Sequence, residues 1–336
     1  MPTIYDVAKE AGVSIGTVSY VINKSKKVRH ETVERVEQAM RKLNYLPSAS
    51  AKALALGRSD VISLVYPSGV IDFQMVLNSI TLAIGEVLEK TDFRLTLLPL
   101  PQDREIQALE ASVQSRLLDG ALLLNTLMND ARVAYLQNTK IPFVMIGRCQ
   151  ENQGLYFVDA DIEAAAHLQV EHLVRLGHRR IAYIGYQDVT ENISSVGFRL
   201  QDAFRSALQE FDLPTDDELF IPACQLPDIV NRIDKLFESP KAPTAVSAAY
   251  EAAVMCVMKS TSRLGIRIPQ DLAVIGYADS PLYPLLTPPV TVVFDRLVEL
   301  GRIATEMLLT LLDGRQPEIP QILLEPRLVQ RASTGE

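Results

Sequence analysis

The sequence predicts a small all-α unit at the N-terminus, followed by a larger α/β body of two lobes with parallel sheets. Apolar residues recur at helical spacing in residues 1–46, whereas short strand-like apolar runs alternate with helical segments from Asp60 onward. Such alternation indicates parallel sheets covered by helices on both faces, and two series of it in one chain indicate two lobes. A chain of 336 residues is long enough for two or three compact units.

The first predicted helix begins at Thr3, which is followed three residues later by Asp6 in the pattern of a capping box. Apolar residues from Ile4 onward then recur at i, i+3, i+4 and i+7, so the helix has one apolar face. Gly12 can adopt the left-handed conformation that ends a helix, and Ser14 is a good N-cap for a second helix. The chain therefore predicts two short helices joined by a tight turn.

The second helix is predicted to bury Val18 and Ile22, which lie four residues apart on one face. Its opposite face is small and rich in hydrogen-bonding groups; it comprises Gly16, Ser19, Tyr20 and Asn23, with Ile15 beside them. One buried face and one small polar face are the layout of a helix-turn-helix, although an ordinary helical hairpin has the same periodicity.

The charge of the chain is unevenly distributed. Residues 1–59 hold 10 Lys or Arg against 5 Asp or Glu, a net charge of +5, so the remaining residues carry −13 of the total of −8. A basic head on an acidic body directs nucleic acid to the head. The basic loop KSKKVR at residues 24–29, next to the second helix, is suited to phosphate contacts.

A third helix is predicted over residues 31–44, and Pro47 ends it. Residues 48–56 form a short stretch rich in small residues. An isolated helix of that length is only marginally stable in water, so it can become ordered on binding. From Asp60 the expected strands are 61–66, 93–98, 121–125, 143–146, 181–185, 244–248 and 272–276. The expected helices are 75–90, 105–118, 130–137, 162–176, 198–211, 226–238 and 251–264.

The run TIYDVAKEAGVSIGTVSYVIN, continued by TVERVEQAMRKLNYLPS and AKALALGRS, resembles the headpiece of the lactose-repressor (LacI/GalR) family of bacterial transcription regulators. The body segments LDGALLL, IPFVMIGR, HLVRLGHRRIAYIG, IPQDLAVIGYAD and LTPPVTVV extend the resemblance to almost the whole chain. It implies a cytoplasmic homodimeric repressor of a carbohydrate-utilisation operon. Its partners would be double-stranded operator DNA and a small-molecule effector, a sugar or glycoside in the closest pattern, with no membrane association and no cofactor.

The same resemblance divides the chain. It implies a helix-turn-helix headpiece at 1–46, a hinge helix at 47–59, and a body like the periplasmic binding proteins at 60–331, with a tail at 332–336. Within the body, lobe one is expected at 60–157 and 291–319, and lobe two at 158–290 and 320–331. Two hinge helices of a dimer would lie in the minor groove, where Leu54 would wedge between base steps.

The family pattern places the second helix in the major groove, where Ile15, Gly16 and Tyr20 occupy the positions that read base edges. An apolar Ile15 and a bare Gly16 suit a thymine methyl group and close backbone approach. The remaining expected DNA contacts position the protein on phosphates and come from Tyr5, Ser14, Thr17, Ser19 and Asn23.

Effector residues are expected in loops that follow strand carboxyl ends, because ligands settle there in such sheets. A polyol needs an aromatic face together with carboxylates and a guanidinium that bind neighbouring hydroxyls. The candidates are Asp72, Phe73, Asp130, Arg148, Arg199, Tyr250, Glu251 and Asp279.

Three departures from the family pattern leave a non-sugar effector open. Ala278 replaces an aspartate in IGYADS, and Tyr250 with Glu251 replaces an Asn-Asp pair. The third departure is the segment IPACQLPD, which lacks the usual aromatic residue. In addition, Arg199 is offset by one residue from the usual spacing. Effector class, operator sequence and the choice between dimer and tetramer do not follow from the sequence.

The sequence argues against an enzyme. It contains no G-x-S-x-G, no P-loop and no G-x-G-x-x-G after a strand, and its histidines lack zinc-site spacing, so no catalytic or metal-binding residue is expected. Three scattered cysteines indicate reduced thiols, and no apolar run approaches a membrane span. Two proteins of other classes would differ from this sequence in visible ways. A solute-binding protein of the transport type would have an export signal and no basic head, and a sugar-modifying enzyme would need a catalytic constellation.

Overall fold

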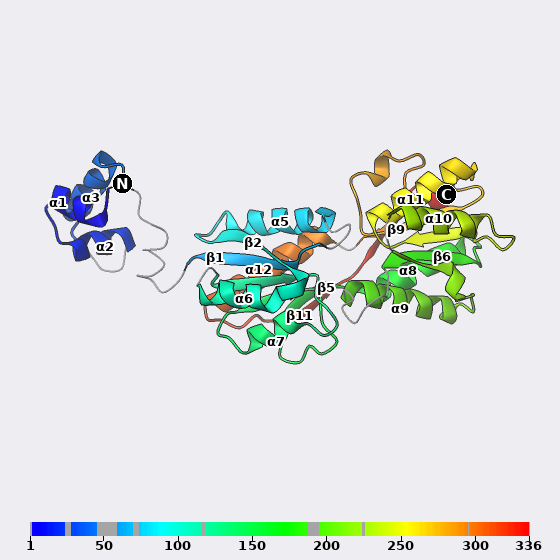
Figure 1. Cartoon of the computed structure of the whole chain (residues 1–336), viewed down its shortest axis with the longest axis horizontal. Helices are drawn as coiled ribbons and strands as arrows, with labels where there is room; N and C mark the ends of the chain where they lie inside the picture. Colours follow the sequence, from blue (N-terminus) through cyan, green and yellow to red (C-terminus); the bar gives the residue numbers. More distant parts are fainter. Residues whose placement is uncertain are drawn as a thin grey trace. The chain divides into compact units, whose positions relative to one another are not determined.

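The computed structural model describes residues 2–23, 28–45, 59–69, 74–115, 118–186, 195–223, 226–294 and 296–335. The N-terminal unit contains three helices: α1 (Ile4–Ala11), α2 (Ile15–Asn23) and α3 (His30–Lys42) (Figure 1). Their shared core is built on Val7, Val18 and Val36, all fully buried. Arg29 precedes α3 without a side-chain cap, as its lack of a hydroxyl or carboxylate predicts.

The first lobe of the body is a six-stranded sheet, and its described pairings β1–β3, β3–β4, β4–β5 and β5–β11 are parallel. In spatial order its strands are β11 (Gln321–Leu324), β5 (Phe157–Ala160), β4 (Phe143–Ile146), β3 (Gly120–Leu124), β1 (Val61–Pro67) and β2 (Arg94–Leu100). Strand β3 is buried along its whole length, which explains its continuous apolar run GALLL.

Helices cover both faces of this sheet (Figure 1). On one face α5 (Gln74–Leu88) packs against α12 (Leu297–Leu312), and on the other lie α6 (Glu105–Gln114) and α7 (Ala131–Gln137). The short helix η1 (Gln102–Arg104) directly precedes α6 in the chain. Gly301 allows α12 to approach α5 closely, since a Cβ there would lie 3.2 Å from the carbonyl oxygen of Ile80. Leu297 and Met307 of α12 are buried in the lobe-one core.

The second lobe is another six-stranded sheet, parallel except for its antiparallel edge strand β12. In spatial order its strands are β12 (Arg327–Val329), β10 (Thr291–Phe294), β9 (Ala273–Tyr277), β8 (Ala245–Ala248), β6 (Ile181–Tyr186) and β7 (Phe220–Ala223). Helices α8 (Ile162–Arg175) and α9 (Ser195–Glu210) pack together on one face, and α10 (Leu226–Phe237) and α11 (Glu251–Leu264) on the other (Figure 1). The short helices are η2 (Asp217–Leu219), η3 (Tyr283–Leu285) and η4 (Ala332–Thr334).

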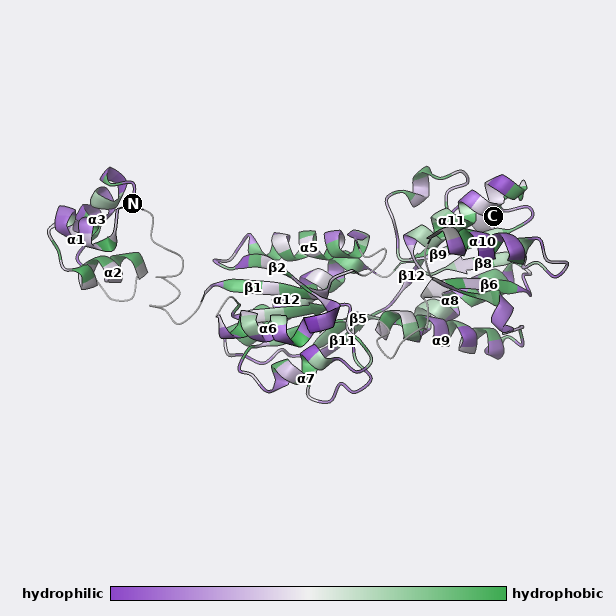
Figure 2. Cartoon of the chain, viewed as in Figure 1, coloured by the Kyte–Doolittle hydropathy of each residue, from purple (hydrophilic) through white to green (hydrophobic). Residues whose placement is uncertain are grey.

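The chain passes between the lobes after β5, β10 and β11. The sequence placed these crossings at 157/158, 290/291 and 319/320, a few residues too early, because each of the three strands belongs to the lobe that the chain is leaving. A strand inside a sheet must complete its hydrogen bonds before the chain can turn away. Figure 2 shows that the strands of both lobes are largely hydrophobic, whereas the outer helices carry hydrophilic faces.

The expected tail is part of lobe two. Ser333 is fully buried and accepts a 2.8 Å hydrogen bond from the backbone of Thr291, while Thr334 bonds to His172 at 3.0 Å. The expectation of a separate tail at 332–336 is therefore wrong for these residues, since the small hydroxyl side chains fill the edge next to β10. Cys149 and Cys256 are buried free thiols. Among the described residues no helix is long and apolar enough to cross a membrane.

Candidate functional site

Helix α1 is fixed at its start by the predicted capping box. The backbone N–H of Thr3 donates to Oδ2 of Asp6 at 2.8 Å, and the backbone N–H of Asp6 donates to Oγ1 of Thr3 at 3.4 Å. Hydrogen bonds from Thr3 lower the pKa of the Asp6 carboxyl. The two residues thus satisfy the open N–H groups of the first turn in both directions.

A residue that the sequence analysis did not single out, Arg35, fixes the end of α1. Its Nε and Nη2 donate to the carbonyl oxygen of Ala11 at 3.2 and 2.5 Å, and Nη2 donates to that of Gly12 at 3.1 Å. Gly12 has the left-handed φ of +62° expected of it. The guanidinium on α3 therefore holds the last carbonyls of α1 where the chain turns into α2.

Helix α2 begins at the expected cap, because the backbone N–H of Thr17 donates to Oγ of Ser14 at 3.1 Å. Ile15 and Tyr20 are 39% and 37% exposed, and Tyr5 on α1 is 68% exposed. Ser14 and Gly16 are also exposed, whereas Thr17 and Ser19 are half-buried. Asn23 is the last residue of α2, and Leu54 lies outside the described residues.

The body contains an open cavity of about 100 Å³ where the carboxyl ends of strands from both lobes meet. Lobe one contributes Asn125 after β3, Gly147 after β4 and Asp159 on β5, while lobe two contributes Tyr250 after β8 and Tyr277 on β9. This is the position at which open parallel sheets hold their ligands.

Most of the cavity wall is apolar. Helix α5 supplies Met75, Val76 and Ile80, and α12 supplies Leu297 and Leu300. The polar groups on the wall are Asn125, Asp159, Glu251 and the two tyrosines. Such a site offers an apolar contact surface with a few oriented hydrogen-bonding groups.

Two of the wall residues, Asn125 and Ala278, have left-handed backbones, with φ of +54° and +60°. An asparagine tolerates this conformation, but an alanine is strained in it. Ala278 is also where the sequence departs from the family's aspartate, so this cavity has a methyl group at the position of a hydrogen-bonding side chain.

Of the eight residues expected to bind an effector, Tyr250 and Glu251 line the cavity. Asp72 and Phe73 lie outside the described residues. Arg148, Arg199, Asp130 and Asp279 are not among the residues that line it. Glu251 stands in the first turn of α11 and accepts a short hydrogen bond from Oγ of Ser280.

Asp130 is instead committed within lobe one. It caps α7 by accepting from the backbone N–H of Arg132 at 2.9 Å, and its Oδ2 lies 2.6 Å from Nη2 of the same arginine. Arg132 is fully buried, so this carboxylate is the counter-ion of a buried cation. Burial raises the pKa of Asp130, but hydrogen bonds and the charge of Arg132 outweigh it, and the net pKa is lowered.

Asp279 is likewise engaged, with its carboxylate oxygens 3.1 and 3.2 Å from Nη2 of Arg331. Its neighbour Ser280 makes the contact with Glu251. The sequence correctly placed Asp279 just beyond a strand end, but an arginine near the C-terminus, distant in the sequence, takes up its charge.

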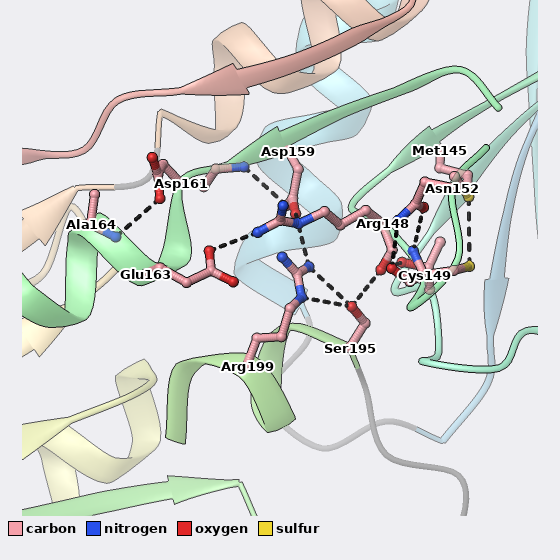
Figure 3. A network of polar contacts seen from close by, with 12 residues as sticks. Met145, Arg148, Cys149, Asn152, Asp159, Asp161, Glu163, Ala164, Ser195 and Arg199 are labelled. Atoms are coloured by element: carbon pink, nitrogen blue, oxygen red, sulfur yellow. Dashed lines mark hydrogen bonds and ion pairs between the residues drawn. The ribbon is translucent and has the colours of Figure 1, made fainter. Parts of the chain in front are cut away.

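Arg148 and Arg199 lie together in a network of charged groups between the lobes (Figure 3). Arg148 follows β4, and Arg199 is on α9. Nη2 of Arg148 lies 2.7 Å from Glu163, and Nη2 of Arg199 lies 2.8 Å from Oδ2 of Asp159. The two expected ligand-binding guanidiniums are therefore paired with carboxylates of the protein itself.

Asp159 is the buried centre of this network. Burial raises its pKa, against the opposing influence of Arg199 and Arg148. Asp159 is not among the effector-binding residues predicted from the sequence. Its place on β5 was hidden because a four-residue buried strand has no clear periodicity. Among the described residues, no group of three His, Cys, Asp or Glu could hold a metal ion.

The lacI family model of bacterial regulatory proteins matches residues 3–48, and a periplasmic binding protein-like domain model matches residues 170–334. The HTH-type transcriptional regulator CelR of Thermobifida fusca is 31% identical over 339 residues, which span 99% of this chain and 98% of that protein. The chain belongs to the lacI family of bacterial regulatory proteins.

Solved structures of lacI family members have the same architecture. A complex of the transcriptional regulator CelR with cellobiose is 28% identical, with a TM-score of 0.73, and covers 99% of this chain and 100% of that one. The lac repressor dimer bound to operator and the anti-inducer ONPF is 26% identical, with a TM-score of 0.84, and covers 100% of this chain and 99% of that one. This lacI family member is thus a cytoplasmic DNA-binding transcription regulator and not an enzyme.

Proposed function

We propose that this regulator is a homodimeric repressor of a carbohydrate-utilisation operon. A sugar or glycoside held in the cavity between the lobes changes its affinity for the operator. The observation that carries the proposal is the cavity at the strand ends of both lobes, in a chain whose N-terminal unit is a helix-turn-helix. The CelR–cellobiose complex and the lac repressor dimer on its operator support it by similarity.

On the DNA side, residues 1–46 form the headpiece and 47–59 the hinge. Each protomer places α2 in the major groove of one half of a near-palindromic operator. Ile15, Gly16 and Tyr20 read base edges, and Leu54 wedges into the minor groove. Contacts to phosphates come from Tyr5, Ser14, Thr17, Ser19 and Asn23.

On the effector side, Asn125 and Glu251 offer the hydrogen-bonding groups, and the rings of Tyr250 and Tyr277 offer surfaces on which a sugar ring can rest. Asp130 and Asp279 take no part, since Arg132 and Arg331 occupy their carboxylates. The ligand set is thus smaller than the one predicted from the sequence.

The test is fluorescence anisotropy on DNA from just upstream of the gene, with increasing concentrations of cellobiose and a panel of other oligosaccharides and phosphosugars. We expect tight, salt-sensitive binding that one glycoside changes by at least about fivefold. Glu251→Gln should weaken the response to that ligand, whereas Glu171→Gln, on the surface of α8, should not. Tight operator binding that no sugar alters would remove the sugar from the proposal.

A second effector class is favoured by the apolar wall of α5 and α12. A planar aromatic molecule such as a nucleobase would lay its flat faces against that apolar surface and bury more of it than a sugar does. Because Ala278 has replaced a residue that grips hydroxyl groups in the family, the ligand panel should include nucleobases alongside the sugars.

A further inference from the structure

Asp159 is part of both the cavity wall and a group of ion pairs between the lobes. It lies in the wall of the cavity, and its Oδ2 stands 2.8 Å from Nη2 of Arg199 and 3.3 Å from Nε of Arg148. Its other oxygen, Oδ1, accepts from the backbone N–H of Ala160 at 2.9 Å. One carboxylate oxygen therefore bridges two guanidiniums.

The groups that meet at this point come from different lobes. Arg148 and Asp159 stand at the ends of lobe-one strands β4 and β5, whereas Glu163 and Arg199 stand on the lobe-two helices α8 and α9 (Figure 3). We call Arg148, Asp159, Glu163, Ser195 and Arg199 the interlobe network. It contains two cations and two anions, and its two shortest ion pairs, Arg148–Glu163 and Arg199–Asp159, each join one lobe to the other.

The network also holds the start of α9 to lobe one. The backbone N–H of Ser195 donates to the carbonyl oxygen of Thr126 at 2.8 Å, and Oγ of Ser195 makes a short hydrogen bond to the carbonyl oxygen of Arg148. Arg199 in turn donates from Nε to Oγ of Ser195 at 3.1 Å. The charged groups and the backbone contacts are thus one connected set across the lobe boundary.

We propose that Asp159 is the positioning residue that couples occupancy of the cavity to the arrangement of the lobes. A ligand group that donates hydrogen bonds to the Asp159 carboxylate competes with Arg148 and Arg199 for it, and so loosens the interlobe network. The inference rests on the proposed function, because it assumes an effector in this cavity.

Two features of the network make this competition effective. Nη1 of Arg199 is buried and has no hydrogen-bond partner among the described residues. The guanidinium therefore depends strongly on the hydrogen bonds that it makes to Asp159 and Ser195. The side chain of Asp159 is only 4% exposed, whereas that of Glu163 is 51% exposed. Loss of the Asp159 interaction leaves buried charge unpaired, whereas water can replace Glu163.

The experiment compares full-length wild type with Asp159→Asn, Glu163→Gln and Glu171→Gln, without any ligand. Glu171 is the matched control, because it pairs with Arg175 within α8 at 2.6 Å and does not cross between lobes. Two quantities are measured: hydrogen exchange at the backbone amide of Ser195, which donates across the lobes, and affinity for the wild-type operator fragment. Circular dichroism checks that each variant is folded.

We expect Asp159→Asn to exchange at Ser195 about tenfold faster or more, and to change operator affinity by about fivefold or more. Glu163→Gln should show a smaller change of the same kind, and Glu171→Gln none. If Asp159→Asn does not fold, Glu163→Gln and Arg148→Lys decide the matter.

The inference is overturned if exchange at Ser195 is unchanged in the folded variants, since the network would then not hold the lobes. It is also overturned if exchange rises while operator affinity stays within twofold of wild type, since the lobe arrangement would then not reach the headpiece. These ligand-free measurements remain decisive even if no sugar alters wild-type operator binding, an outcome that would remove only the proposed effector.

Discussion

Replacing Arg35 with methionine should unlock the turn of the helix-turn-helix and weaken operator binding. Methionine keeps the apolar stem on α3 but removes the three hydrogen bonds that the guanidinium makes to the carbonyl oxygens of Ala11 and Gly12. Each such bond contributes about 0.5 kcal/mol at this partly exposed site, below the usual range for charged donors, so the loss is about 1.5 kcal/mol. That corresponds to about a tenfold larger open population of the turn.

The effect should be visible because the headpiece has so small a core, centred on three valines, that little other energy holds α1 to α2. Hydrogen exchange at the amide of Val13, which donates to the carbonyl oxygen of Ala8 at 3.0 Å, measures the opening in the full-length chain. Arg41→Met is the control, since Arg41 only pairs with Glu37 on the surface of α3. Equal exchange and equal operator affinity in the two variants would refute the role given to Arg35.

Three other outcomes are expected. Asp130→Asn should destabilise the body by about 3 kcal/mol in urea unfolding, because the buried Arg132 loses the closer of its two carboxylate partners and keeps only Glu105, 3.3 Å from its Nε. The pKa of Asp130 is lowered in the fold, so the loss of stability in Asp130→Asn relative to wild type should be complete above the ordinary pKa of 3.8 and should shrink as the pH falls below it. A loss of stability that does not depend on pH would contradict the pairing. Leu54→Ala should leave the fold intact and sharply weaken specific operator binding, while Tyr20→Ala should alter base preference in a binding-site selection, and unchanged operator recognition in both would reject the DNA assignment. Ala278→Gly should raise the free energy of unfolding by about 0.5 kcal/mol, and with it the urea midpoint, because glycine adopts a φ of +60° without strain. A lower midpoint would show that packing of the methyl group outweighs the backbone strain.

Much of the fold could be predicted because its elements carry strong local signals. Helix α11 was predicted with its observed bounds, Glu251–Leu264, since Gly265 provides the left-handed residue that ends it. The capping box at Thr3 and the N-cap at Ser14 were also predicted and found. These features depend on contacts between residues a few positions apart, which a sequence displays directly.

The strands at the lobe boundaries could not be predicted in the same way. Strands β5, β10 and β11 are four residues long each, and each has a pairing partner further along or back in the chain: β5 pairs with β11, and β10 with β12. A short buried strand has neither alternation nor a turn signal of its own. The crossings were consequently placed at the starts of these strands instead of at their ends.

For the effector site, the sequence predicts where charged residues lie but not which of them are paired within the protein. The sequence placed Asp130, Arg148 and Asp279 after strand ends, and the structure has them there, but position in a loop does not reveal whether a charge is free. Each of these side chains has an ionic partner: Arg132 two residues away, Glu163 on the other lobe, and Arg331 near the C-terminus. A charge in a cleft costs free energy unless it is paired, so the protein itself fills most of the positions that a ligand could use. What remains for the ligand is the small polar set on an apolar wall, and that set, more than the inherited fold, decides which molecule this regulator senses.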